Sequence, residues 1–415
     1  MSSVKDIPNG WLQTTIGELV ELAQGVAINA KTNYVLTDKE NGIPLLKINN
    51  LLNNTIDQYA NPELVPKQSI IHKNDIIFTR TGQVGEVLIN KYGILHNNSF
   101  KVIPNKELHW SYLYWYLKDI RVYNYVQKVA AGSVQKDLNH GAFKTIEFKY
   151  PKDIEEQKAI ANILTAFDNK IENLQAQNKT LEQTAQTIFK EWFGEYQIGD
   201  ELPDGWEIFG MSGLVETVNG YSYKGKELVP ESDEALVTLK SFDRNGGFQT
   251  RGFKPFKGTP KETQKVQIGD LVVAHTDLTQ DAEVLGNPAF IFDNGGYNKM
   301  YITMDLVKVN PIHKDISSSF LYYLMKDRRF KGHCVGYANG TTVLHLSKKA
   351  IPEYRLPLPL DFKKVKEFSA IANATTSKIS LNKDAIKSLA ETRDTLLPKL
   401  MSGKIRVNAF KDELQ

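Results

Sequence analysis

The chain has 415 residues, which fits a few domains at roughly 100–200 residues each, and its 41% hydrophobic content allows a real core. The net charge of +3 is too small to identify a partner. The single cysteine, Cys334, excludes an internal disulfide and a cysteine zinc cluster, and no apolar run is long enough to span a membrane. The polar N-terminus gives no sign of a signal peptide, so we expect a cytoplasmic protein.

The chain begins with about 150 residues that are rich in turn-forming residues and short β-type runs. The run Ile76–Thr79 follows the turn-forming pair Asn74–Asp75, a pattern typical of a strand after a tight turn. A polar loop, Thr79–Gly85, comes directly after this predicted strand, and a second polar loop follows at Gly132–Lys136. We therefore predict a mixed α/β domain over residues 1–150.

A long amphipathic helix is predicted in residues 151–195. Apolar residues from Ile160 to Trp192 recur at alternating spacings of four and three, which is a heptad pattern. Such a helix is about 50 Å long at ~1.5 Å per residue, more than one domain of this size can cover. The pattern therefore predicts pairing with another long helix, and a stripe packed on the helix's own domain is the alternative.

The second half of the chain repeats the first. Ile7–Trp11 returns as Leu202–Trp206 at an offset of 195 residues, and Lys170–Ile171 returns as Lys378–Ile379 at an offset of 208. The second copy therefore carries an insertion of 13 residues, between about residues 77 and 113 in first-half numbering. The order and spacing of the matches predict a duplicated domain followed by a duplicated helix.

This repeat predicts an α+β fold with two pseudo-symmetric mixed α/β domains, residues 1–150 and 196–358. Long-helix regions at residues 151–195 and 359–415 separate them and pair as an antiparallel coiled coil, because a pseudo-two-fold axis requires that direction. The same axis sets Asn178 opposite Asn382 and Phe167 opposite Arg393. The predicted helix–helix seam comprises Ile160, Leu164, Phe167, Ile171, Leu174, Asn178, Leu181, Ile188, Ile379, Asn382, Ile386, Leu389 and Leu396.

Several fragments resemble enzyme motifs, but each is incomplete. Gly220–Glu227 follows a phosphate-binding pattern until its last place, where a glutamate stands instead of the serine or threonine that holds magnesium. Asn287–Phe290 is similar to an amino-methyltransferase motif but lacks its second proline, and no glycine-rich cofactor loop accompanies it. The histidines show no metal-ligand spacing. We therefore predict a chain that is not an enzyme and holds no metal or cofactor of its own.

Polar loops at equivalent places in the two halves are candidate nucleic-acid contacts. Arginine can bond guanine, glutamine adenine and aspartate cytosine, while serine, threonine and lysine suit phosphates. Solvated loops without a ligand are the alternative. The candidate DNA-binding residues are Lys31, Arg80, Thr81, Gln83, Ser133, Gln135, Lys136, Lys224, Lys226, His275, Thr276, Asp277, Thr279, Gln280, Thr341, Thr342 and His345.

The sequence resembles the specificity (S) subunits of type I restriction-modification systems. The Gly132–Lys136 loop is similar to their Gly-Ser-Thr-Gln-Lys motif, and Asp75–Gly82 resembles their strand and Arg-x-Gly loop. The C-terminal stretch Thr392–Ile405 is typical of the family, as is Pro-x-Gly-Trp near each domain start. The resemblance covers the whole chain in order, although the second copy of the glycine-containing loop has lost its glutamine and lysine.

This resemblance implies a DNA-binding specificity subunit in a phage-defence system. Such a subunit reads a bipartite, asymmetric target, one half-site per target-recognition domain, and carries two methyltransferase (M) and two motor-nuclease (R) subunits. S-adenosylmethionine, ATP and magnesium then belong to those partners. A duplicated-domain adaptor for proteins, and a methyltransferase or nuclease in its own right, stay open as alternatives. The recognised bases, the spacer length and the choice between restriction and methylation alone do not follow from the sequence.

Overall fold

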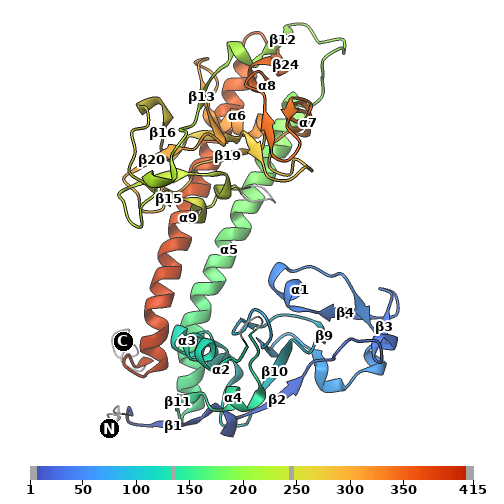
Figure 1. Ribbon diagram of the computed structural model, residues 1–415, viewed down its shortest axis with the longest axis vertical. Helices are drawn as coiled ribbons and strands as arrows, with labels where there is room; N and C mark the ends of the chain where they lie inside the picture. Colours follow the sequence, from blue (N-terminus) through green and yellow to red (C-terminus); the bar gives the residue numbers. More distant parts are fainter. Residues whose placement is uncertain (1–6, 133–135, 243–246, 408–415) are drawn as a thin grey trace. The chain divides into compact units, whose positions relative to one another are not determined.

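The computed structural model describes residues 7–132, 136–242 and 247–407. The chain divides into two compact units (Figure 1): unit 1 comprises Met1–Lys170 and Leu389–Gln415, and unit 2 comprises Ile171–Ser388. Each unit contains one mixed α/β domain and a segment of each long helix, α5 (Ile154–Phe193) and α9 (Lys363–Met401). The predicted α+β fold class is confirmed.

Besides the two-stranded sheet of β1 and β11, the domain of unit 1 contains two larger sheets, which share an apolar cluster that includes Ile77 and Leu95. One is antiparallel throughout, in the order β2-β10-β7-β8, and the other has the order β3-β5-β4-β9-β6, in which β4 and β9 are parallel. The strands are β1 (Trp11–Thr15), β2 (Val20–Gln24), β3 (Leu36–Thr37), β4 (Ile43–Leu46), β5 (Tyr59–Ala60), β6 (Ile70–Ile71), β7 (Ile76–Thr79), β8 (Val87–Leu88), β9 (Gly93–Leu95), β10 (Ser99–Pro104) and β11 (Glu147–Pro151). The strand β7 is buried at every position, as its apolar run predicts.

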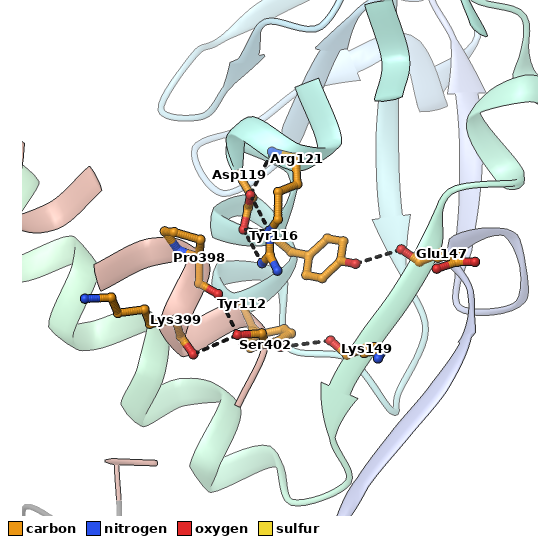
Figure 2. Close-up of polar contacts among 9 residues, drawn as sticks. All are labelled: Tyr112, Tyr116, Asp119, Arg121, Glu147, Lys149, Pro398, Lys399 and Ser402. Carbon is orange, nitrogen blue, oxygen red and sulfur yellow. Dashed lines mark hydrogen bonds and ion pairs between the residues drawn. The ribbon is translucent and has the colours of Figure 1, made fainter. Parts of the chain in front are cut away.

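Helices α2 (Trp110–Leu117) and α3 (Ile120–Val129) cover the β2-β10-β7-β8 sheet, and α1 (Ile48–Asn53) and α4 (His140–Lys144) are short. The hydroxyls of Tyr112 and Tyr116 donate to the carbonyls of Lys149 and Glu147 on β11 (Figure 2). Nearby in Figure 2, the Ser402 hydroxyl bonds the carbonyls of α9's last turn. The first domain is thus completed by the end of the last helix.

Unit 2 repeats this architecture. Its sheet β13-β21-β17-β19 has the antiparallel order of β2-β10-β7-β8, and its sheet β15-β14-β20-β16 again contains one parallel pair, β14 with β20. The elements are β12 (Trp206–Gly210), β13 (Val215–Asn219), β14 (Glu234–Val237), β15 (Lys254–Pro255), β16 (Lys265–Val266), β17 (Leu271–Ala274), β18 (Thr276–Asp277), β19 (Pro288–Phe290), β20 (Lys299–Ile302), β21 (Leu306–Pro311), β22 (Ala338–Asn339), β23 (Leu344–Leu346), β24 (Arg355–Pro359), α6 (Ser318–Met325), α7 (Arg328–Gly336) and α8 (Ala350–Glu353).

The sheet registers show where the second copy is longer. Ile77 pairs with Leu88 in unit 1, and Val272 pairs with Ala289 in unit 2, so the first part of the insertion lies between β17 and β19. The connection between β7 and β8 spans residues 80–86, whereas that between β17 and β19 spans residues 275–287. The insertion predicted from the repeat offsets therefore lengthens the polar loop that follows the central strand.

The two long helices run antiparallel within each unit. The α5 helix begins after Asp153, whose carboxylate accepts a bond from the Glu155 amide, and acidic residues occupy its first turn, where they favour the helix dipole. In unit 2 the Asn382 side chain donates to the Asn178 side chain at 2.8 Å, which is the predicted pairing. In unit 1 Arg393 bonds Asp168. Phe167, the predicted neighbour of Arg393, lies half-buried at the adjacent position.

Every residue predicted for the seam is buried or half-buried. Pro398 lies inside α9, in its last turn, and the helix continues to Met401. No helix in the described part of the chain is long and apolar enough to cross a membrane.

Candidate nucleic-acid interface

Two polar loops meet in unit 1. The post-strand loop, residues 80–86, follows the buried strand β7, and the glycine loop, residues 131–138, follows α3. Thr81 forms a β-bridge with Asp137, the Gly82 amide donates to the Lys136 carbonyl at 2.9 Å, and the Leu138 amide donates to the Arg80 carbonyl at 2.9 Å. The structure thus brings together two loops that the sequence selected separately. Ser133 and Gln135, two predicted contacts, lie outside the described residues.

Arg80 links the two loops through side-chain hydrogen bonds. Its guanidinium forms a bidentate hydrogen bond with the Asp137 carboxylate, with Nη2 at 2.7 Å and Nε at 3.2 Å from the carboxylate oxygens. Its Nη1 donates to the side-chain oxygen of Gln24 at 3.3 Å. The Thr81 hydroxyl also donates to Asp137 at 2.6 Å. The Arg80 bonds, with help from Thr81, lower the pKa of the Asp137 carboxyl. Most of the Arg80 donors are therefore engaged inside the protein, which makes Arg80 a positioning residue for the loops.

Other side chains of these loops remain available to a ligand. Gln83 is exposed, while its backbone carbonyl accepts a bond from the Thr79 hydroxyl inside the loop. Gln127 on α3 donates to the Val84 carbonyl at 2.6 Å and accepts from Lys136 at 2.9 Å. Lys136 is exposed and can still offer charge to solvent. An exposed amide beside an exposed ammonium suits a base edge next to a phosphate.

The equivalent loops of unit 2 meet in the same way. The post-strand loop, residues 275–287, contains β18, and the glycine loop, residues 339–346, contains β23. Strands β18 and β23 are antiparallel, with Thr276 paired to His345 and Asp277 to Leu344. The Gln280 side chain also donates to the Thr341 carbonyl. The paired loops are thus a feature of both repeats.

The chemistry at the junction of the loops differs between the repeats. His275 stands where unit 1 has Arg80, and His345 stands where it has Asp137. Burial lowers the pKa of His275, with smaller contributions from the positive charges of His345 and Lys348. Its buried Nε2 has no hydrogen-bond partner among the described residues. Unit 2 therefore joins its loops without the ion pair that joins them in unit 1.

An internal carboxylate and an internal ammonium hold the longer loop of unit 2. Asp277 accepts bonds from the amides of Thr279, Val284 and Leu285 at 2.6–3.0 Å. Burial raises the pKa of Asp277, but these bonds outweigh it, so that the pKa is lowered. Lys331 on α7 donates to the carbonyls of Ala282 and Leu285 and to the Asn287 side chain, all within 2.9 Å. Asp277 and Lys331 therefore act on the loop's own backbone.

The remaining candidate residues fall into two groups. Thr276 is buried and donates to Asp305 at 3.2 Å, so its hydroxyl is bonded inside the protein and is not presented to a ligand. Thr279 donates its hydroxyl to Asp277. The exposed candidates are Thr341, Thr342 and His345 on the glycine loop, Lys31 between β2 and β3, and Lys224 and Lys226 between β13 and β14.

Sequence reasoning missed the residues that position the loops. Asp137 and Gln127 hold the loops of unit 1, and Lys331 holds the loop of unit 2. Asp137 directly follows the glycine-loop motif, which was the one available signal. Gln127 and Lys331 lie on helices far along the chain from the loops they bind, and no local pattern points to them. Among the described residues, no group of three histidine, cysteine, aspartate or glutamate side chains could hold a metal ion.

Comparison with known proteins finds similarity to DNA-specificity proteins. A family model described as the type I restriction modification DNA specificity domain matches residues 8–183. The MjaIX type I restriction enzyme specificity subunit of Methanocaldococcus jannaschii is 26% identical over 81% of this chain and 79% of its own length. The MjaVIII specificity subunit of the same organism is 24% identical over 97% of this chain and 94% of its own.

A solved structure shares the fold over nearly the whole chain. The S subunit of a type I restriction-modification system from M. genitalium superposes with a TM-score of 0.57 at 19% identity, covering 96% of this chain and 98% of that one. The similarity extends over both repeats and both long helices.

Proposed function

We propose that the chain is a specificity subunit of a type I restriction-modification system, whose task is DNA target recognition. Its two target-recognition domains each read one half of a bipartite, asymmetric DNA sequence. In this role the chain is not itself an enzyme. The paired loops of each domain supply the reading surface, and the helices carry no base-reading side chains.

One observation carries this proposal: the same pair of loops recurs in both units with different side chains. The backbone pairing of Thr81 with Asp137 matches that of Thr276 with His345. Exposed side chains then differ, with Gln83 in unit 1 and Leu278 at the equivalent place on the longer loop of unit 2. The same loop pairing with different exposed side chains fits two separate half-sites, because the side chains that contact base edges determine which sequence is bound.

We extend the proposal to the partners. Two methyltransferase subunits and two motor-nuclease subunits assemble on this chain in the cytoplasm, and they bring S-adenosylmethionine, ATP and magnesium. The duplicated domains support a pair of methyltransferase subunits, one for each repeat.

Exchange of one target domain tests the central claim. Residues 1–150 are replaced by those of a relative, and the methylated sites are mapped in cells that express the full complex. One half of the methylated sequence should change and the other half should stay. The matched control exchanges residues 196–358 and should change the other half. If either exchange alters both halves, the domains do not read independently and the proposal fails.

A further inference from the structure

The post-strand loop of unit 2 holds one large apolar side chain out into solvent. Leu278 is 72% exposed, the highest value among the large hydrophobic side chains of the described residues. An exposed leucine is common on protein surfaces and by itself indicates nothing. Leu278 differs from such residues because it lies at a defined position in the paired loops.

Leu278 occupies the same place as Gln83. The bridges Thr81–Asp137 and Thr276–His345 align the two loops by backbone pairing, and Gln83 and Leu278 each follow two residues after the bridged threonine. Both side chains are exposed. Each repeat thus presents one free side chain at this point, a hydrogen-bonding amide in unit 1 and a hydrocarbon group in unit 2.

The loop around Leu278 is ordered by bonds on both sides. Asp277, directly before it, accepts amides from three later residues of the loop, and Thr279, directly after it, donates both its amide and its hydroxyl to Asp277. Lys331 binds the carbonyls at the far end of the same loop. Leu278 therefore stays exposed because the residues on both sides of it bond within the loop. A ligand that contacts Leu278 then causes little further loss of conformational entropy in the chain.

The chemistry of a leucine side chain limits what it can read. It offers no donor or acceptor, so it cannot distinguish guanine, cytosine or adenine by hydrogen bonds. The methyl group of thymine is the one apolar group that a base presents in the major groove. Burial of that methyl against Leu278 removes apolar surface of both from water.

We infer that Leu278 is a specificity-determining residue that contacts a thymine methyl group in the half-site read by the second domain. The inference rests on the proposed function and adds a base class to it. It also requires that this half-site contain an A·T pair at the contacted position.

Replacement of thymine by uracil isolates the methyl group. After the methylated sequence has been mapped, the assembled complex is titrated with duplexes in which each half-site thymine is replaced singly by uracil. For the wild-type complex, one such replacement in the second half-site should weaken binding about four-fold, the effect of one buried methyl group. For Leu278→Ala the thymine and uracil duplexes should bind equally.

The matched control is Leu381→Ala, because Leu381 is another exposed leucine of unit 2 but lies on α9. That variant should keep the wild-type preference for thymine. A wild-type complex that binds all uracil duplexes like the thymine duplex overturns the inference, as does a preference that survives Leu278→Ala or a second half-site without an A·T pair. Specific binding of the mapped sequence itself tests the proposed function separately, and its loss would overturn both.

Discussion

At the scale of single residues, charged groups of the candidate interface bond mainly other groups of the protein itself. Arg80 was predicted to read a base, yet its guanidinium bonds Asp137, which lies 57 positions along the chain. Asp277 was predicted to accept from cytosine, yet its oxygens already accept three amides and one hydroxyl. The sequence selects these loops because their residue types are typical of DNA contacts, and the structure brings the selected loops together in each unit. It does not distinguish readers from positioning residues, because the bonds that do so come from distant segments.

Asp277→Ala tests this positioning role. Loss of the carboxylate leaves buried amides of the post-strand loop without an acceptor, and we expect the free energy of unfolding to fall by about 1–3 kcal/mol. Chemical denaturation of the chain measures this change. Site mapping should also show relaxed recognition in the second half-site alone, because the loops of unit 1 are untouched. Asp281→Ala, on an exposed residue of the same loop, is the matched control and should leave both measurements near wild type.

At the scale of elements, the heptad pattern and the repeat together predicted the pairing of the long helices. The predicted partners Asn178 and Asn382 bond each other because a pseudo-two-fold axis fixes the register once the repeat offset is known. The pattern did not predict Asp168 as the partner of Arg393. A heptad identifies apolar positions, whereas the polar residue beside the seam depends on the domain packed there. Lys118, which directly follows α2, also contacts Asp168.

The asparagine pair gives an element-scale prediction. Asn382→Leu leaves the Asn178 amide without its partner, so we expect a lower melting temperature. The double variant Asn178→Leu with Asn382→Leu replaces the polar layer by an apolar one and should melt above wild type, because a polar residue in a seam fixes register at a cost in stability. Thermal denaturation of the wild type, the single variant and the double variant measures the three melting temperatures. A double variant that melts no higher than the single one would show that the pair stabilises the helices rather than selecting their register.

At the scale of the whole molecule, the recurrence of the four-stranded antiparallel sheet and of the long helix follows from duplication, which the sequence shows. The short sheet β3-β5-β4-β9-β6 was not predicted, because strands of two to four residues leave no periodic signal. The contact of the N-terminal segment with the C-terminal one was not predicted either. Arg406 bonds both oxygens of the buried Glu156 carboxylate and the Asn9 carbonyl, and Trp11 donates to the same carboxylate.

Arg406→Ala tests that contact. The variant leaves the buried carboxylate of Glu156 without its cationic partner, although the bond from Trp11 remains. We expect the free energy of unfolding to fall by about 1–3 kcal/mol, less than for a fully buried pair because Arg406 is a third exposed. Lys404→Ala, an exposed neighbour, should have little effect. Equal stability of the two variants in urea denaturation would rule out a structural role for the Arg406–Glu156 pair.

Acidic pH should weaken the fold as a whole. Burial is the main reason that the pKa values of His96, His109, His140 and His275 lie below the ordinary 6.5. The unfolded chain therefore takes up protons below about pH 6.5 that the folded chain resists, so the free energy of unfolding falls as the pH drops through this range. The Asp137 and Asp277 carboxyls have lowered pKa values and stay charged there.

Thermal denaturation between pH 7.5 and 5.5 measures this effect, and the melting temperature should fall with the pH. His275→Gln removes one of the contributing groups and should make the decline shallower. A melting temperature that rises as the pH drops would contradict the lowered pKa values of these half-buried histidines.

Unit 1 is built from two separate segments of the chain, and this has a consequence for its folding during synthesis on the ribosome. Unit 1 needs Leu397, Leu400 and Arg406 for its core and its closing contact, and these residues are synthesised after all of unit 2. Unit 1 therefore starts to emerge from the ribosome before unit 2 but is completed only after all of unit 2 has been made. A chain cut short by a premature stop keeps both sets of paired loops but lacks the segment that closes unit 1. The stability of unit 1 thus reports that translation continued past unit 2.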